Sequence, residues 1–274
     1  MSSASVVKTG SSALPNNAHE KWRQARQREL AGPDSWLGLV GLFWLEPGVN
    51  RVGSGADCTV LLPAGPALLG ELDWLGGQVF WRPASGETVE LATDANGQPD
   101  IVEHESLAFF IVEREGRLAA RLRDRGWADK APFNGIDCFD FDPAWQIEAR
   151  WEALSPPLQM EVPNVSGELK QVEVSHRAVF QHDGQEIALL PMSVSDKELF
   201  FVFRDRTSGK LSYGAGRFLK ARPPVDGKVV LDFNRAFNPP CAFTPFATCP
   251  LPPPENWLGF EVPVGELKWD KQGH

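Results

Sequence analysis

The sequence has no long hydrophobic run, little cysteine and a single tyrosine. Its longest apolar stretch, WLGLVGLFWL from Trp36 to Leu45, has ten residues, whereas a helix that spans a membrane needs about 20. The opening residues, MSSASVVKTGSSALPNN, contain no apolar core of the kind that a secretory signal requires. We therefore expect a cytoplasmic protein in a reducing compartment, with no membrane partner.

The chain has fewer positive than negative residues. It contains 27 Lys and Arg residues and 36 Asp and Glu residues, which gives a formal net charge of −9. A surface with this balance repels polyanions, so we expect no nucleic-acid partner. The motifs His-Glu-x-x-His and Gly-x-Ser-x-Gly are absent, and so is a Walker loop. The sequence predicts neither a metal site nor a cofactor, and it assigns no catalytic residue.

The four cysteines are Cys58, Cys138, Cys241 and Cys249. In a reducing compartment such residues are more often free thiols or metal ligands than disulfides. Cys241 and Cys249 have seven residues between them, whereas the paired cysteines of zinc sites have two to four. A catalytic thiol needs a nearby base, for which His176 and His182 are the internal candidates.

One helix is expected near the N-terminus. HEKWRQARQREL is rich in helix formers, and Asn17 precedes it at capping-box spacing from Glu20. Gly32-Pro33-Asp34 ends the helix. Residues 1–16 are small and polar, so we expect a disordered tail there.

Short apolar or alternating runs divided by turn residues fill most of the remaining chain. The runs that suit strands are CTVLL, QVFWR, ETVEL, LAFFIVER, RLAARLR, QIEARWE, LKQVEVS, RAVFQ, EIALL, LFFVFR and KVVLDF. Asp183-Gly184 and Asp226-Gly227 are typical of tight hairpin turns. No amphipathic helices alternate with these runs, so we predict a mainly β fold, an antiparallel β-sandwich or barrel with a short N-terminal α-helix.

The domain organisation follows from the same pattern. We expect a single β-rich domain over residues 17–274, with no convincing linker. The amino-acid composition changes at Leu154–Gly167, and this change could divide the chain into two β-rich halves, 36–153 and 168–270. The stretch GVNRVGSGADCTVLLP (Gly48–Pro63) resembles the opening of a forkhead-associated domain, which makes the first half forkhead-associated-like in this interpretation. The following stretch lacks the Ser-x-x-His element that such domains use for phosphopeptides.

The segment Asp232–Asn256, DFNRAFNPPCAFTPFATCPLPPPEN, holds seven of the 23 prolines. Proline fixes φ, removes a backbone donor and pushes the preceding residue to extended geometry. We call this stretch the Pro-rich segment and expect it to follow a nearly fixed path, which suits the wall of a binding pocket. Alternatively, it is a structural lid that packs its phenylalanines onto the sheets, or a rigid surface for a protein partner.

We predict that a pocket roofed by this segment binds a small polar or anionic ligand. Arg121 and Arg217 supply positive charge in this interpretation, since arginine offers a planar fork of donors to carboxylate or phosphate. Asparagines give directional hydrogen bonds, and acids orient the arginines or exchange protons. The candidate ligand-binding residues are Arg121, Asp124, Tyr213, Arg217, Asp232, Asn234, Asn238, Cys241, Cys249, Glu255 and Asn256. The alternative function is an enzyme, a hydrolase or isomerase that uses Cys241 or a carboxylate.

From about Trp22 to Leu267 the chain resembles a family of bacterial and archaeal proteins, the domain of unknown function numbered 1684. The resemblance is carried by SWLGLVGLFWLEPGVNRVGS, RLRD, FRDRTSGKLSYGAGRFL, LDFNRAFNPPCAFTPFATCPLPPPENWL and VGEL. It implies a soluble, mostly β protein whose activity is not established. It supplies no catalytic assignments, so the candidate residues above rest on their own chemistry.

Overall fold

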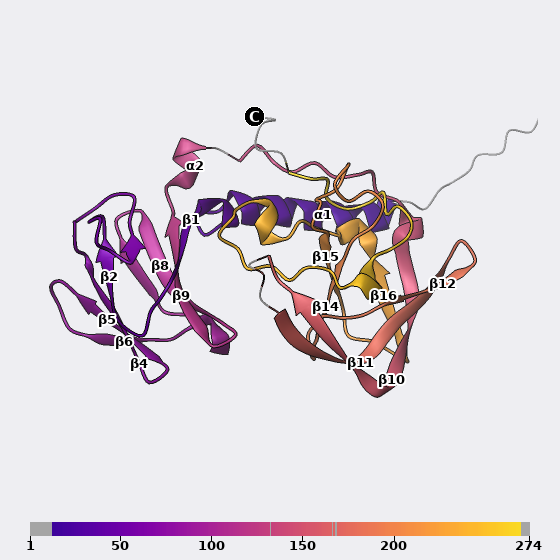
Figure 1. The fold of residues 1–274 in the computed structure, drawn as a ribbon. Coiled ribbons are helices and arrows are strands. Elements are labelled where there is room, and N and C mark those ends of the chain that lie inside the picture. Colours follow the sequence, from indigo (N-terminus) through magenta and orange to yellow (C-terminus); the bar gives the residue numbers. More distant parts are fainter. Residues whose placement is uncertain (1–12, 132, 166, 168, 270–274) are drawn as a thin grey trace, which may run out of the picture.

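The computed structural model describes residues 13–131, 133–165, 167 and 169–269. It confirms the predicted mainly antiparallel β fold with an N-terminal helix, α1. Figure 1 shows the strands in two groups, which we call the N-terminal lobe (β1–β9) and the C-terminal lobe (β10–β16). The expected disordered tail lies outside the described residues as far as residue 12, whereas residues 13–16 begin α1.

Two sheets pack face to face in the N-terminal lobe, with strand orders β1-β9-β8-β7 and β3-β2-β4-β5-β6. Their strands are β1 (Leu39–Trp44), β2 (Gly48–Gly53), β3 (Val60–Leu61), β4 (Gly70–Leu75), β5 (Gln78–Pro83), β6 (Val89–Leu91), β7 (Ile101–His104), β8 (Leu107–Arg114) and β9 (Arg117–Asp124). Leu72 and Trp81 from one sheet share a buried core with Phe109, Ile111 and Leu122 from the other. This arrangement is a β-sandwich. The forkhead-associated-like topology of this half stays a prediction.

The C-terminal lobe also consists of two sheets, with orders β12-β11-β10-β16 and β13-β14-β15. Their strands are β10 (Gln146–Pro163), β11 (Leu169–His182), β12 (Gln185–Leu189), β13 (Ser193–Val194), β14 (Leu199–Phe203), β15 (Arg217–Ala221) and β16 (Lys228–Asp232). Phe180 and Leu231 from the first sheet pack with Phe201 and Phe203 from the second. Val264, near the C-terminus, completes this core.

Turn chemistry sets the hairpins of both lobes. Asp183 and Asp226 have φ of 49° and 50°, and the glycine after each also has positive φ, as the Asp-Gly dipeptides predict. LKQVEVS and RAVFQ, expected as two strands, form the single long β11. The change in composition at Leu154–Gly167 lies within the paired β10–β11 hairpin, so it does not separate the two lobes.

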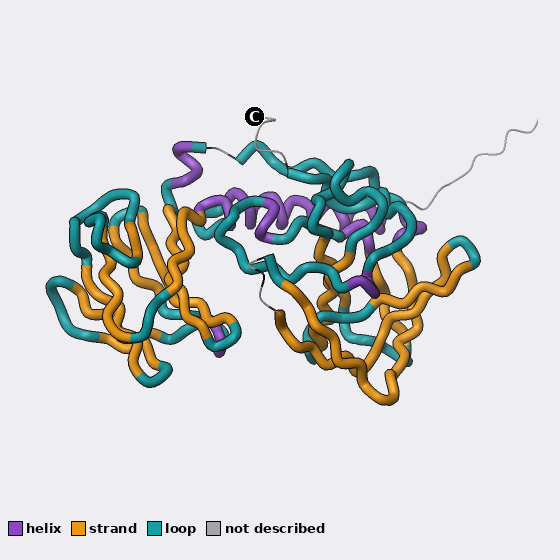
Figure 2. The backbone as a smooth tube through the Cα atoms, in the orientation of Figure 1, coloured by secondary structure: helices purple, strands orange, loops and turns teal. Residues whose placement is uncertain are grey.

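α1 spans Ala13–Ala31, so the expected helix is confirmed but starts earlier than its expected cap, and Asn17 lies inside it. Leu30 is fully buried with Ile136 and Phe243, which holds the helix against loops of the C-terminal lobe (Figure 2). Among the described residues no helix is long and apolar enough to cross a membrane. The shorter helices are α2 (Trp127–Lys130), η1 (Trp36–Gly38), η2 (Asp94–Asn96), η3 (Pro143–Trp145), η4 (Phe233–Arg235), η5 (Pro240–Ala242) and η6 (Pro254–Asn256).

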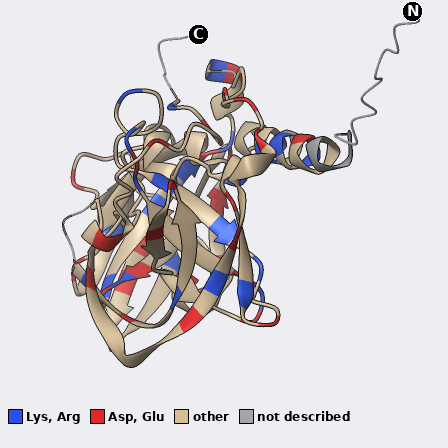
Figure 3. Ribbon diagram, turned by 90° about the vertical axis from the view of Figure 1, so that its right-hand side faces the viewer, with Lys and Arg blue, Asp and Glu red and all other residues tan. Residues whose placement is uncertain are grey.

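Charges of both signs are interspersed on the outer strands of the C-terminal lobe (Figure 3). Arg150 pairs with Glu186 on the neighbouring hairpin at 2.9 Å, and Lys228 pairs with Glu148 at 2.6 Å. Such exposed pairs contribute about 0–1 kcal/mol each. They keep this face polar, with positive and negative charges in balance.

Candidate functional site

Strand alternation brings two arginines of the N-terminal lobe to the C-terminal lobe. Leu118 and Leu122 of β9 are in the sandwich core, so Arg121 projects from the opposite face. Arg121 Nη2 donates to the hydroxyl oxygen of Thr248 at 3.4 Å, and Arg114 Nε donates to the same oxygen at 3.1 Å. Thr248 belongs to the Pro-rich segment, so this segment meets both arginines where the lobes touch.

Arg121 is a buried cation, 3% exposed, for which the described chain supplies no carboxylate partner within ion-pair distance. Its guanidinium lies 5.6 Å from the Trp36 ring, and its Nε finds no hydrogen-bond partner among the described residues. Burial, and then repulsion from Arg114, lowers the pKa of Arg121 to about 10. The carboxylate of Asp94 favours its charge, but both oxygens of Asp94 are bound by Arg114, at 2.9 and 2.8 Å.

Two adjoining cavities lie beside these arginines. The first, about 350 Å³, is lined by Arg114 and Lys170, and the second, about 370 Å³, is lined by Trp36. Ser193 and Phe200 line both cavities, which therefore form one hollow between the lobes that we call the interlobe groove. The Pro-rich segment contributes to its walls through Phe237, Pro240, Thr248 and Pro250.

Cys241 and Cys249 lie together behind the wall of the interlobe groove, each directly after a residue that lines it. The backbone N–H of Cys241 donates to Cys249 Sγ at 3.2 Å. The Tyr213 hydroxyl donates to the Cys241 carbonyl oxygen at 3.0 Å. Cys249 is buried and Cys241 half-buried, and all four cysteines of the chain are free thiols. The described residues contain no cluster of three or more His, Cys, Asp or Glu side chains that could hold a metal ion.

Contacts at both ends of the Cys241–Cys249 loop bring its two thiols together. Before the loop, the Asn238 N–H donates to a carboxylate oxygen of Glu266 at 2.6 Å. After it, the Cys249 carbonyl oxygen accepts the Val165 N–H at 3.0 Å. Two successive prolines and the short helix η5 fix the intervening path, so the approach of the thiols depends on backbone geometry.

The two thiols differ in acidity. A hydrogen bond with Cys249 lowers the pKa of Cys241 against the opposing effect of burial, and the Tyr213 hydroxyl lowers it further. The same thiol–thiol contact, together with burial, raises the pKa of Cys249. Burial also raises the pKa of Tyr213, so its phenol stays protonated and remains a donor. Cys241 is therefore the thiol that ionises first.

We expect iodoacetamide to alkylate Cys241 at lower pH than Cys138. The thiolate is the reacting form, and burial raises the pKa of Cys138 to about 11 while the pKa of Cys241 is lowered. Raising the pH should label Cys241 before Cys138. Peptide mass spectrometry of the reduced protein, alkylated briefly across a pH series, measures both midpoints. Equal midpoints would show that the Cys249 contact does not activate Cys241.

Two of the predicted asparagines use their amides on neighbouring backbone. The side chain of Asn256 accepts the Leu190 N–H at 2.8 Å and donates to the Leu190 and Val202 carbonyls. Asn234 accepts the Asp142 N–H and donates to the Asp142 carbonyl, each at 2.9 Å. Both residues are fully buried, so they join segments of the fold and have no free donor for a ligand.

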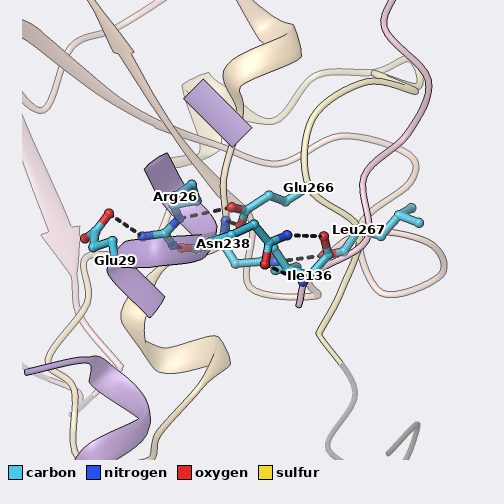
Figure 4. Close-up of polar contacts among 7 residues, drawn as sticks. Arg26, Glu29, Ile136, Asn238, Glu266 and Leu267 are labelled. Carbon is cyan, nitrogen blue, oxygen red and sulfur yellow. Dashed lines mark hydrogen bonds and ion pairs between the residues drawn. The ribbon is translucent and has the colours of Figure 1, made fainter. Parts of the chain in front are cut away.

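Asn238 is part of a buried cluster that fastens α1 to the Pro-rich segment (Figure 4). Its Nδ2 donates to the Leu267 carbonyl at 2.7 Å, and its own carbonyl accepts a bond from Arg26 at 3.1 Å. Arg26 also pairs with Glu266 at 3.0 Å. The cluster accounts for the fixed position of Asn238 without a ligand.

Arg217, expected to attract an anion, is instead an internal structural residue. It is fully buried, pairs with Asp205 at 2.7 Å and donates to the backbone carbonyls of Val262 and Val264. Its charge is thus used to hold the C-terminal segment against β15. It does not line the interlobe groove.

The three candidate acids lie apart from one another. Asp124, the last residue of β9, is buried and pairs with Lys130 at 2.6 Å. Asp232 pairs with Arg235 at 3.2 Å and lines a further cavity of about 720 Å³. Glu255 is exposed in η6. The structure therefore does not assemble an acid/base pair from them.

Of the predicted residues, Tyr213, Cys241 and Cys249 contact one another behind the groove wall, and Arg121 contacts Thr248, which lines the groove. Arg114 and Thr248, which line the groove themselves, were not among the candidates. A signal for Arg114 was present, since the Glu115-Gly116 turn between two strand-like runs implies a hairpin. That hairpin pairs Arg114 with Arg117, which lies four positions before Arg121 on the same strand. Thr248 was marked only by its place among the polar residues of the Pro-rich segment, and its contact with the two arginines depends on how the lobes pack.

These features define a two-lobed, mainly antiparallel β protein with a groove between the lobes that is lined by charges of both signs, and with an adjacent dithiol. The model of the family described as "Protein of unknown function (DUF1684)" matches residues 131–267, half of the chain, so the chain belongs to this family. No curated protein matches. A solved structure, that of the uncharacterized protein from gene locus rrnAC0354 of Haloarcula marismortui, is 31% identical, with a TM-score of 0.42. The match covers 53% of this chain and 81% of that one.

Proposed function

We propose that the protein binds a small anionic molecule, a carboxylate or phosphate, in the interlobe groove. The observation that carries the proposal is the buried charge of Arg121, which lines neither cavity itself and reaches the groove through its hydrogen bond to Thr248. Burying an unpaired cation costs several kcal/mol, so folded proteins pair such charges or use them for binding. A bound anion would provide the counter-charge that Asp94, bound by Arg114, does not.

Thr248 connects Arg121 to the cavity. Its hydroxyl oxygen accepts hydrogen bonds from both Arg114 and Arg121, so its own proton is available to donate into the cavity that it lines. Two guanidinium groups behind this hydroxyl make it a stronger donor to an anion. Lys170 lines the same cavity and adds a second cation to Arg114, while Glu113 and Glu115 line it with carboxylates. A cavity of about 350 Å³ suits a small molecule.

We expect Arg121→Met to abolish stabilisation by anions and to raise the melting temperature of the ligand-free protein. Methionine keeps an apolar contact with Trp36, while loss of the unpaired buried charge stabilises the fold by on the order of 1 kcal/mol or more. Thermal unfolding and calorimetric titration with inorganic phosphate and with acetate test both effects. Acetamide, a neutral analogue of acetate, should have no effect.

Arg28→Met is the matched control, because Arg28 is exposed on α1 and lines neither cavity of the groove. This control should retain the response to anions. Thr248→Val should lose it while keeping the shape of the wall. A response that survives in Arg121→Met, or a ligand-free Arg121→Met protein that is less stable than the wild type, would refute the role given to Arg121.

A further inference from the structure

The neighbour of Cys241 indicates which chemistry its thiol can perform. An acyl-transfer nucleophile needs a base beside it. His176, the first candidate base, lies on β11 with its ring stacked on Trp151 at 5.4 Å, and its Nδ1 contacts Ser175. The group beside Cys241 is instead a second thiol, Cys249. Two adjacent thiols of unequal acidity are suited to oxidation and reduction.

We propose that Cys241 and Cys249 form a redox-active dithiol that reduces a small hydroperoxide and closes to a disulfide. This activity goes beyond anion binding and does not require it. Cys241 is the attacking thiol because it is half-buried, next to the groove wall, whereas Cys249 is buried behind it. Cys249 is the resolving thiol, held at 3.2 Å from the Cys241 nitrogen.

The reaction balances in two steps. In the first, the Cys241 thiolate attacks one oxygen of the hydroperoxide, the O–O bond breaks, and an alcohol or water leaves with a proton from solvent, which gives a sulfenic acid. In the second, the Cys249 sulfur attacks the Cys241 sulfur, the S–O bond breaks, and the hydroxyl leaves as water with the Cys249 proton. Two thiols and one hydroperoxide thus yield one disulfide, one alcohol and one water. An external dithiol restores the reduced pair.

Access to the pair favours a small oxidant. The groove consists of cavities of about 350 and 370 Å³, and the thiols lie one residue behind its wall at Pro240 and Thr248. Hydrogen peroxide or a short alkyl hydroperoxide fits such a space. A peptide disulfide, which must place a sulfur in line with Cys241, meets Phe237 and Phe200 first, because both line the groove.

The test uses the full-length reduced protein and one equivalent of hydrogen peroxide. Peptide mass spectrometry should find a disulfide between Cys241 and Cys249, with Cys58 and Cys138 still open to alkylation. We expect the pair to be consumed at least about tenfold faster than Cys58. In a parallel arm, oxidised glutathione should form the same bond much more slowly. Oxidation of Cys58 at the same rate as Cys241, or no Cys241–Cys249 disulfide, would overturn the proposal.

Variants then separate the two roles. In Cys249→Ser, peroxide should leave a sulfenic acid at Cys241 that dimedone traps, whereas Cys241→Ser should leave Cys249 unoxidised under the same conditions. Cys138→Ser is the matched control and should form the disulfide normally. Peptide mass spectrometry of the wild-type protein needs no variant, so its result decides the proposal even if a serine substitution unfolds the chain. It also runs without any anion, so its failure is distinct from a failure of anion binding.

Discussion

Asp205→Asn should lower the free energy of unfolding by about 3–5 kcal/mol, because it leaves the buried guanidinium of Arg217 without its counter-ion. The side chains of Arg217 and Asp205 are both 0% exposed, and their Nη2 and Oδ2 atoms are 2.7 Å apart. Water cannot replace the lost carboxylate at this depth. The carbonyls of Val262 and Val264 remain as acceptors, but they carry no net charge.

Thermal unfolding monitored by circular dichroism measures this loss, which corresponds to a fall in melting temperature of about 6–20 °C for a chain of this size. Glu148→Gln is the control, since it breaks an ion pair with Lys228 in which both side chains are more than half exposed. Its effect should not exceed about 1 kcal/mol. If the two variants melted at the same temperature, the C-terminal segment would be held by its apolar side chains and not by the buried pair.

Arg217 shows what could not be inferred from the sequence alone. RDRTSGKLSYGAGR contains Asp205 and Arg217, and the planar fork of donors that arginine offers predicted an anion-binding role for Arg217. What assigns Arg217 to the interior is contact with a carboxylate 12 positions away and with carbonyls 45 and 47 positions away. Only the tertiary fold determines such partners. The residue type was informative, but its environment could not be inferred.

Local features of the sequence predicted the architecture well. LAFFIVER coincides with β8, and the turn at Glu115-Gly116 leads into β9 as its left-handed geometry requires. Period-two patterns work here because each sheet buries one face. The start of α1 was placed too late, since residues before Asn17 continue the helix and an asparagine in helix-compatible surroundings need not cap it.

The candidate site was predictable in part. Prolines fix a path, and the sequence correctly drew attention to the Pro-rich segment, four of whose residues line the interlobe groove. The amides of Asn234 and Asn256, however, bind backbone that is distant in sequence. Rigid loops need such internal partners for their buried backbone groups. A rigid polar loop therefore contains more structural than ligand-binding side chains, and composition does not distinguish the two.

Arg26→Met should lower the free energy of unfolding by about 3–5 kcal/mol at neutral pH, because it leaves the Glu266 carboxylate buried without a cation. Arg26 is 9% and Glu266 0% exposed, and their Nε and Oε1 atoms are 3.0 Å apart. The same guanidinium lies over Phe237 and Phe243 of the Pro-rich segment. Arg28→Met, two positions along α1 on its exposed side, should change stability by no more than about 1 kcal/mol.

The loss of stability in Arg26→Met should depend on pH. Burial raises the pKa of Glu266, and Arg26 opposes that effect, so the pKa rises further in Arg26→Met. A carboxyl whose folded-state pKa exceeds its unfolded value binds its proton more tightly when folded. Stability is therefore retained below the unfolded pKa and lost as the pH rises through the folded pKa. Urea titrations in acid and at neutral pH should show a smaller deficit in acid, and an equal deficit would contradict this assignment.

The same variant tests whether α1 and the Pro-rich segment shape the groove together. Arg26 and Glu29 line one of its cavities, and Arg26 binds the carbonyl of Asn238, three residues before Cys241. Loosening that contact frees the end of the loop that holds the thiols together. At neutral pH, alkylation of Cys241 should become slower in Arg26→Met and less sensitive to Cys249→Ser, because the thiol–thiol contact that lowers its pKa no longer forms. An unchanged rate in a folded Arg26→Met protein would show that the prolines alone hold the dithiol.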